Sequence, residues 1–134
     1  MKNVVVDAGF LVALWRVADE HHVWAVATAR AHAPIWITCE SVISEAEHLL
    51  GAPGRASLRT ACRRGALVIA PVLSEEAGAV IELLEKYDNI PMSVADACLV
   101  RLTETLPEAV VLTTDTDFRI YRRLGRRTVP CMLP

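Results

Sequence analysis

Carboxylates placed directly after predicted strands are the residues in this sequence best suited to chemistry. Asp7 follows the β-branched run at 3–6, and Asp115 follows the apolar run at 109–113. Carboxylates that gather in one place repel one another unless some are protonated or a divalent cation holds them ionised. All-oxygen ligands favour Mg²⁺ or Mn²⁺ over zinc. An ion bound in this way can activate water for attack on a phosphodiester.

Asp96 is a third candidate, because it is the only polar residue between Val94 and Val100. A buried carboxylate is costly unless it is paired or binds a metal. A structural role is equally open, since Ser93 and Asp96 have the spacing of a capping box, in which the carboxylate binds the start of its own helix.

The roles of three further acids remain open between alternatives. Glu45 and Glu47 lie on opposite flanks of the apolar stripe of one predicted helix, and helical periodicity does not choose between them. Asp117 follows Asp115 by two residues, whereas a turn followed by a helix cap needs only one acid.

The elements that must position these side chains alternate between strand and helix patterns. The predicted strands are 3–6, 35–38, 67–70, 109–113 and an edge strand at 128–130. The predicted helices are 8–15, 22–33, 40–50, 55–64, 74–87 with Ser74 as N-cap, 93–106 and 117–124. The alternation predicts an α/β fold, a mainly parallel sheet of four to five strands with helices on both faces. We expect one domain over residues 1–134, with Asp7 and Asp115 at the carboxyl edge of the sheet, where ligands bind in such folds.

In the order of its acidic motifs, the sequence resembles the PIN-domain nucleases, in particular the VapC-type toxins of toxin–antitoxin pairs. The matching motifs are Asp7 after the first strand, Glu45 followed by Leu49-Leu50, Asp96 in Ala-Asp-Ala, and Thr113-x-Asp115-x-Asp117-Phe118. The resemblance covers nearly the whole chain. It implies an Mg²⁺- or Mn²⁺-dependent endoribonuclease that acts as a toxin. The implied catalytic and metal-binding residues are Asp7, Glu45, Asp96 and Asp115, with Asp117 as an accessory ligand, so the resemblance selects Glu45 over Glu47.

The resemblance also implies partners: an RNA substrate, a VapB-like antitoxin whose tail blocks the acidic cleft, and a second copy of the chain in a homodimer. The sequence departs from the family pattern at Gly9, where many relatives carry Ser, Thr or Asn. That departure puts in doubt a side chain that would contact the metal or its water, and it leaves the four acids unaffected.

Positive charge for binding RNA must be local, because 14 Lys and Arg against 16 Asp and Glu give a net charge of −2. Five arginines lie between 119 and 127, directly after the last acidic motif. We predict that Arg119, Arg122 and Arg123 contact RNA phosphates or an inhibitor's carboxylates. The structural alternative is a solvated helix face.

The cysteines and the apolar runs indicate where in the cell the protein is expected. Four cysteines without metal-binding spacing predict reduced thiols and a cytoplasmic protein. Runs without a polar side chain, such as 8–15, are too short for a membrane span, so no membrane association is expected. A competing function from another class is a non-catalytic PIN-like module that binds a protein partner.

Overall fold

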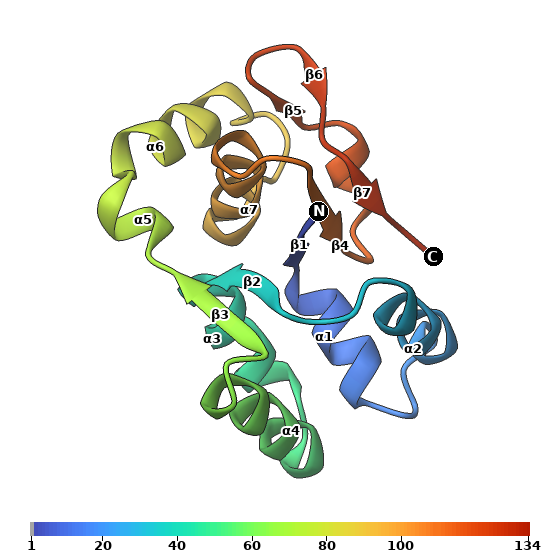
Figure 1. Cartoon of the computed structure of the whole chain (residues 1–134). Coiled ribbons are helices and arrows are strands. Elements are labelled where there is room, and N and C mark those ends of the chain that lie inside the picture. Colours follow the sequence, from blue (N-terminus) through green and yellow to red (C-terminus); the bar gives the residue numbers. More distant parts are fainter. Residues whose placement is uncertain (1) are drawn as a thin grey trace.

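One five-stranded parallel sheet lies at the centre of the computed structural model, which describes residues 2–134 (Figure 1). Its strands are β1 (Asn3–Val6), β2 (Trp36–Cys39), β3 (Leu67–Ala70), β4 (Ala109–Leu112) and β7 (Cys131–Met132). Their order is β3-β2-β1-β4-β7, and every neighbouring pair is parallel. The predicted α/β class with a parallel sheet is confirmed.

Two groups of helices flank the sheet (Figure 1). The connections from β1 to β2 and from β2 to β3 contain α1 (Ala8–Trp15), α2 (His22–Ala31), α3 (Glu40–Leu49) and α4 (Ala52–Arg63). The return from β3 to β4 contains α5 (Val72–Glu75), α6 (Ala77–Lys86) and α7 (Val94–Thr105). Right-handed crossovers that run in opposite directions along a sheet place their helices on opposite faces. Within residues 2–134, no helix has both the length and the apolar character that a membrane crossing requires.

The chain adds strands on one side of β1 (β2, then β3) and then crosses back to add β4 on its other side, so the order of strand addition reverses between β1 and β4. Val6 lies opposite Leu112 in the parallel register, and both side chains are fully buried. Ligands in open α/β sheets bind beyond the carboxyl ends of strands at such a reversal. The residues that follow β1 and β4 are therefore the ones best placed to form a site.

Most predicted boundaries agree with the structure within a residue or two, but the start of α4 does not. Gly51 and Pro53 have the pattern of a helix stop, which places the predicted start at 55. In the structure Gly51 is the N-cap and Pro53 lies in the first turn. A proline is tolerated there because the first amides of a helix have no partner within the helix.

The helix predicted at 74–87 is two helices, α5 and α6, and Ser74 lies inside α5 rather than at its N-cap. The break falls at Glu76, whose backbone leaves helical geometry. The Glu76 carboxylate accepts hydrogen bonds from Arg101 of α7 at 3.0 and 3.1 Å. This tertiary contact has no signal in the local periodicity.

The C-terminal predictions are also wrong in detail. The region predicted as a helix at 117–124 is a short 3₁₀ helix, η1 (Thr116–Arg119), followed by an antiparallel hairpin of β5 (Arg122–Arg123) and β6 (Arg127–Thr128). Leu124 and Gly125 both have positive φ, as a tight hairpin turn requires. Gly125 is therefore a turn residue rather than a helix stop. The last strand of the sheet is β7 and not 128–130.

Candidate active site

Asp7 connects the end of β1 to the start of α1 and is 6% exposed. One carboxylate oxygen accepts the amide of Ala8 at 2.7 Å, and the other accepts the Thr113 hydroxyl at 2.7 Å. Burial raises the pKa of Asp7 to about 7, and the carboxylates of Asp96 and Glu45 add to the rise against these two hydrogen bonds. Asp7 is thus a buried acid within electrostatic range of two other acids.

Asp96 combines the two roles that the sequence left open. Ser93 Oγ accepts the amide of Asp96 at 3.0 Å, while Asp96 Oδ2 accepts the amide of Ser93 at 3.2 Å, so the capping box is present. The same Oδ2 atom accepts the hydroxyl of Tyr121 at 3.0 Å. Burial raises the pKa of Asp96, and the charge of Asp115 adds to the rise. The capping carboxylate therefore also lies in the electrostatic field of the other acids.

Thr113 joins the first and last acidic motifs through one hydroxyl. Its Oγ1 donates to Asp7 and accepts the amide of Asp115 at 3.0 Å. Asp115 in turn accepts the amide of Asp117 at 2.9 Å and caps η1. Of the two acids, Asp115 provides the cap, and Asp117 contributes a second, half-buried carboxylate nearby.

The structure distinguishes Glu45 from Glu47, which periodicity does not. The charge of Glu45 acts on Asp7 across the site. Glu47 instead forms an ion pair with Arg59 of α4. Glu45, although exposed, therefore lies within electrostatic range of Asp7, whereas Glu47 is paired with the neighbouring helix.

Together the acids form a set of oxygen donors at the reversal point of the sheet. Burial and mutual repulsion raise the pKa of Asp7 and Asp96, and a bound divalent cation would relieve this cost. The donors suit a hard ion such as Mg²⁺ or Mn²⁺. Within residues 2–134, no three His, Cys, Asp or Glu side chains lie together as a ready-made metal cage. The donor chemistry thus fits such an ion, although the carboxylates are not already closed around one position.

Two residues of this site, Tyr121 and Thr114, carry no clear signal in the sequence. Tyr121 is fully buried and binds Asp96 from 25 residues away, so only the tertiary fold reveals it. Burial and the Asp96 carboxylate raise the pKa of the Tyr121 hydroxyl above its usual range, which keeps it a hydrogen-bond donor. At Gly9, an added Cβ would overlap with Thr114 Oγ1. A hydroxyl from another loop therefore fills the space that a side chain at position 9 would occupy.

The arginines near the C-terminus divide into two groups. Arg122 donates to the backbone carbonyls of residues 119–121 at 2.8–3.1 Å, and Arg123 donates to the Thr103 carbonyl at 2.6 and 3.1 Å. The Arg122 guanidinium therefore binds the segment that precedes the hairpin, and the Arg123 guanidinium joins the hairpin to α7. The exposed members of the group are Arg119, Arg126 and Arg127.

Comparisons with known proteins identify the family and a similar fold. The family model of the PIN domain matches residues 4–124. Among solved structures, VapC20 of Mycobacterium tuberculosis, described as a sarcin-ricin loop cleaving toxin, is similar over 86% of this chain and 92% of its own. Its TM-score is 0.73 at 19% sequence identity, a likeness of fold. A search of curated proteins gave no significant match. Because the family model covers nearly the whole chain, the protein belongs to the PIN domain family.

Proposed function

We propose that this protein is an Mg²⁺- or Mn²⁺-dependent endoribonuclease and the toxin of a VapBC-type toxin–antitoxin pair. The observation that carries the proposal is the set of acids at the carboxyl edge of β1 and β4, where burial and mutual repulsion raise the pKa of Asp7 and Asp96. The PIN family match supports a nuclease, and the similarity of fold to VapC20 supports a toxin. The proposed domain spans residues 1–134.

In this proposal Asp7, Glu45, Asp96 and Asp115 are the catalytic acids that hold the ion, and Asp117 is an accessory ligand. The ion supplies activated water and neutralises charge on the scissile phosphate. The protein supplies the positions of the ligands. The Thr113 hydroxyl orients Asp7 and the backbone of Asp115 together.

Two donors hold the carboxylate of Asp96. The backbone of Ser93 and the hydroxyl of Tyr121 both donate to Asp96 Oδ2, which leaves its other oxygen, Oδ1, as the candidate for the ion. Hydrogen bonds of this kind fix the orientation of a ligating carboxylate and tune its affinity. Tyr121 is therefore a positioning residue for Asp96.

RNA phosphates require cations near this acidic edge. Of the three arginines predicted to contact RNA, Arg119 at the end of η1 remains our proposed contact, because its side chain is exposed. Arg122 and Arg123 are half-buried and engaged with backbone carbonyls, so any contact they make with RNA would compete with their role in the hairpin.

The proposed partners are an RNA substrate, a VapB-like antitoxin and a second copy of the chain. The PIN family match and the similarity of fold to VapC20 support the RNA substrate and the antitoxin. The four cysteines are free thiols, which agrees with the proposed cytoplasmic location.

The test is cleavage of RNA by the purified protein in Mg²⁺, in Mn²⁺ and in chelator. Total RNA and an oligonucleotide with the sarcin–ricin loop are the first substrates, because VapC20 is described as cleaving that loop. Asp96→Asn and Glu45→Gln should abolish metal-dependent cleavage. Glu47→Gln is the matched control, since it removes a carboxylate from the same helix that faces α4 instead of the site. Equal cleavage by Glu45→Gln and the parent would remove Glu45 from the catalytic set.

Calorimetry with Mn²⁺ separates this proposal from a non-catalytic module that only binds a partner. Binding of Mn²⁺ that is lost in Asp96→Asn, together with metal-dependent cleavage, supports the nuclease. Absence of both Mn²⁺ binding and cleavage would instead favour the partner-binding module.

A further inference from the structure

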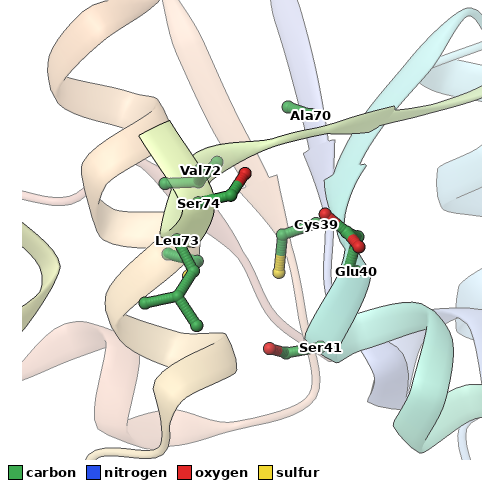
Figure 2. Close-up of a pocket in the computed structure, with 8 residues that line it drawn as sticks. Cys39, Glu40, Ser41, Ala70, Val72, Leu73 and Ser74 are labelled. Carbon is green, nitrogen blue, oxygen red and sulfur yellow. The ribbon is translucent and has the colours of Figure 1, made fainter. Parts of the chain in front are cut away.

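A pocket of about 210 Å³ lies beyond the carboxyl ends of β2 and β3, next to the acidic site but outside it. Its wall combines the start of α3 with α5 and α7, and its lining includes Cys39, Ser41, Val72, Leu73, Ser74 and Cys98. Figure 2 shows the Cys39 sulfur directed into this space, toward the segment that carries Leu73 and Ser74. The proposed nuclease chemistry assigns no role to this pocket.

Two thiols meet at the pocket. Cys39 is the N-cap of α3, and Cys98 lies in the second turn of α7. Both residues are at most 2% exposed and line the same pocket, and each thiol is the first cause of a pKa shift in the other, upward for Cys39 and downward for Cys98. They are 59 residues apart in the sequence, so only the packing of α7 on β2 and α3 brings them together.

We propose that Cys39 and Cys98 are a peroxide-sensitive pair that forms an intramolecular disulfide. One sulfur attacks a hydroperoxide oxygen, the O–O bond breaks, and water or an alcohol leaves as the sulfur becomes a sulfenic acid. The second sulfur then attacks the first, and the sulfenic oxygen leaves as water. In sum, two thiols and one hydroperoxide give one disulfide, one alcohol or water, and one further water. The peroxide is reduced by two electrons, and the thiols are oxidised by two.

Geometry favours this pair over the other two cysteines. A disulfide requires two cysteines that lie close together in the fold, and Cys39 and Cys98 line the same pocket from elements that pack against each other. Cys62 and Cys131 are more exposed, but they lie on α4 and β7 and do not line the pocket. The less accessible pair should therefore be the one that closes.

The bond would join two elements that carry acids of the site. Cys98 lies two residues after Asp96 on α7, and Cys39 begins the helix that carries Glu45. A crosslink that closes a loop of this length restricts the unfolded chain and stabilises the folded one. The thiol chemistry does not depend on the proposed nuclease activity, so it is tested by mass and by thermal unfolding.

The experiment treats the reduced full-length protein with one equivalent of hydrogen peroxide and maps its tryptic peptides without reductant. Cys39 falls in peptide 31–55 and Cys98 in peptide 87–101, while Cys62 and Cys131 fall in 60–63 and 128–134. We expect a crosslink between 31–55 and 87–101 that dithiothreitol reverses. We also expect a higher Tm for the oxidised protein than for the reduced one.

Controls decide whether the fold directs this pairing. The Cys62→Ser, Cys131→Ser double variant should form the same crosslink, and Cys98→Ser should not. Peroxide treatment in urea should lose the preference for this pair. The proposal is overturned if Cys39 and Cys98 remain alkylatable in the treated parent protein while Cys62 or Cys131 is oxidised, or if only crosslinks between chains form. The peptide map of the parent protein gives this answer even if Cys98→Ser does not fold.

Discussion

Replacement of Asp7 by asparagine tests the electrostatics of the site without RNA. Asp7 is 6% exposed, and its pKa of about 7 in the folded chain compares with 3.8 for an ordinary aspartate. At 1.36 kcal/mol for each pKa unit, ionisation of this carboxyl in the fold costs about 4 kcal/mol. The substituted amide would keep an oxygen for the Ala8 backbone N–H but would misdirect the Thr113 hydroxyl, which costs about 1 kcal/mol. We therefore expect Asp7→Asn to stabilise the metal-free protein by about 3 kcal/mol at pH 8, or about 10 °C in Tm.

The sign of the pH dependence follows from the raised pKa. Below pH 3.8 the carboxyl is protonated in both the folded and the unfolded chain, so it imposes no ionisation cost. Between pH 3.8 and about 7 the unfolded chain releases the proton and the folded chain keeps it, so the stability of the parent protein falls as pH rises. Above pH 7 the carboxyl is ionised in both the folded and the unfolded chain, so its contribution to the free energy of unfolding no longer changes with pH. The advantage of Asp7→Asn should therefore grow from about pH 4 to about pH 7 and then level off.

The assay is urea unfolding at pH 4, 6 and 8 in chelator, repeated at pH 8 with Mn²⁺. Asp88→Asn serves as the control, because Asp88 is exposed at the surface. Mn²⁺ should stabilise the parent protein and have little effect on Asp7→Asn. A variant that is less stable than the parent at pH 8 in chelator would refute the reasoning, as would an advantage of equal size at pH 4 and pH 8.

Further predictions concern the space above α1, the hairpin and the buried hydroxyl. Gly9→Ala should lower the free energy of unfolding by about 1–3 kcal/mol. Thr114→Ala in the same chain should recover most of that loss, because it removes the oxygen that overlaps with the added Cβ. Additive losses in a double-mutant cycle would contradict this. Arg126→Ala with Arg127→Ala should leave Tm unchanged and lower the salt slope of RNA binding by about 0.7 for each phosphate that is no longer bound, whereas an unchanged slope would return both side chains to a solvated surface. Tyr121→Phe should reduce stability by about 2 kcal/mol, because it removes a buried hydrogen bond to a carboxylate, and urea unfolding that matches the parent would argue against that bond.

The strands and the first acidic position could be predicted because their signals are local. The run at 3–6 is β-branched and buried on both faces, so its pattern indicates a central strand whatever surrounds it. The bounds of β1 and β3 agree with the sequence prediction at every residue. An acid directly after a central parallel strand must lie at the carboxyl edge of the sheet, and Asp7 does.

Features that depend on tertiary contacts could not be predicted from local patterns. Glu45 and Glu47 have the same chemistry on the same helix, and only the positions of Asp7 and Arg59 separate them. The break at Glu76 arises where a helix meets its neighbour. Gly125 has the same local signature as a helix stop and as a hairpin turn.

The position of β4 in the sheet has a consequence for synthesis of the chain. β4 lies beside β1, yet more than 100 residues separate them in sequence, as the pairing of Val6 with Leu112 shows. While the chain emerges from the ribosome, β1 can pair with β2 on one side, but its other edge stays open until nearly the whole chain has been made. Such an edge is a template for wrong pairing and aggregation. The same delay keeps Asp7 apart from Thr113 and Asp115, so a nascent chain cannot assemble the acidic site before its last strands are made.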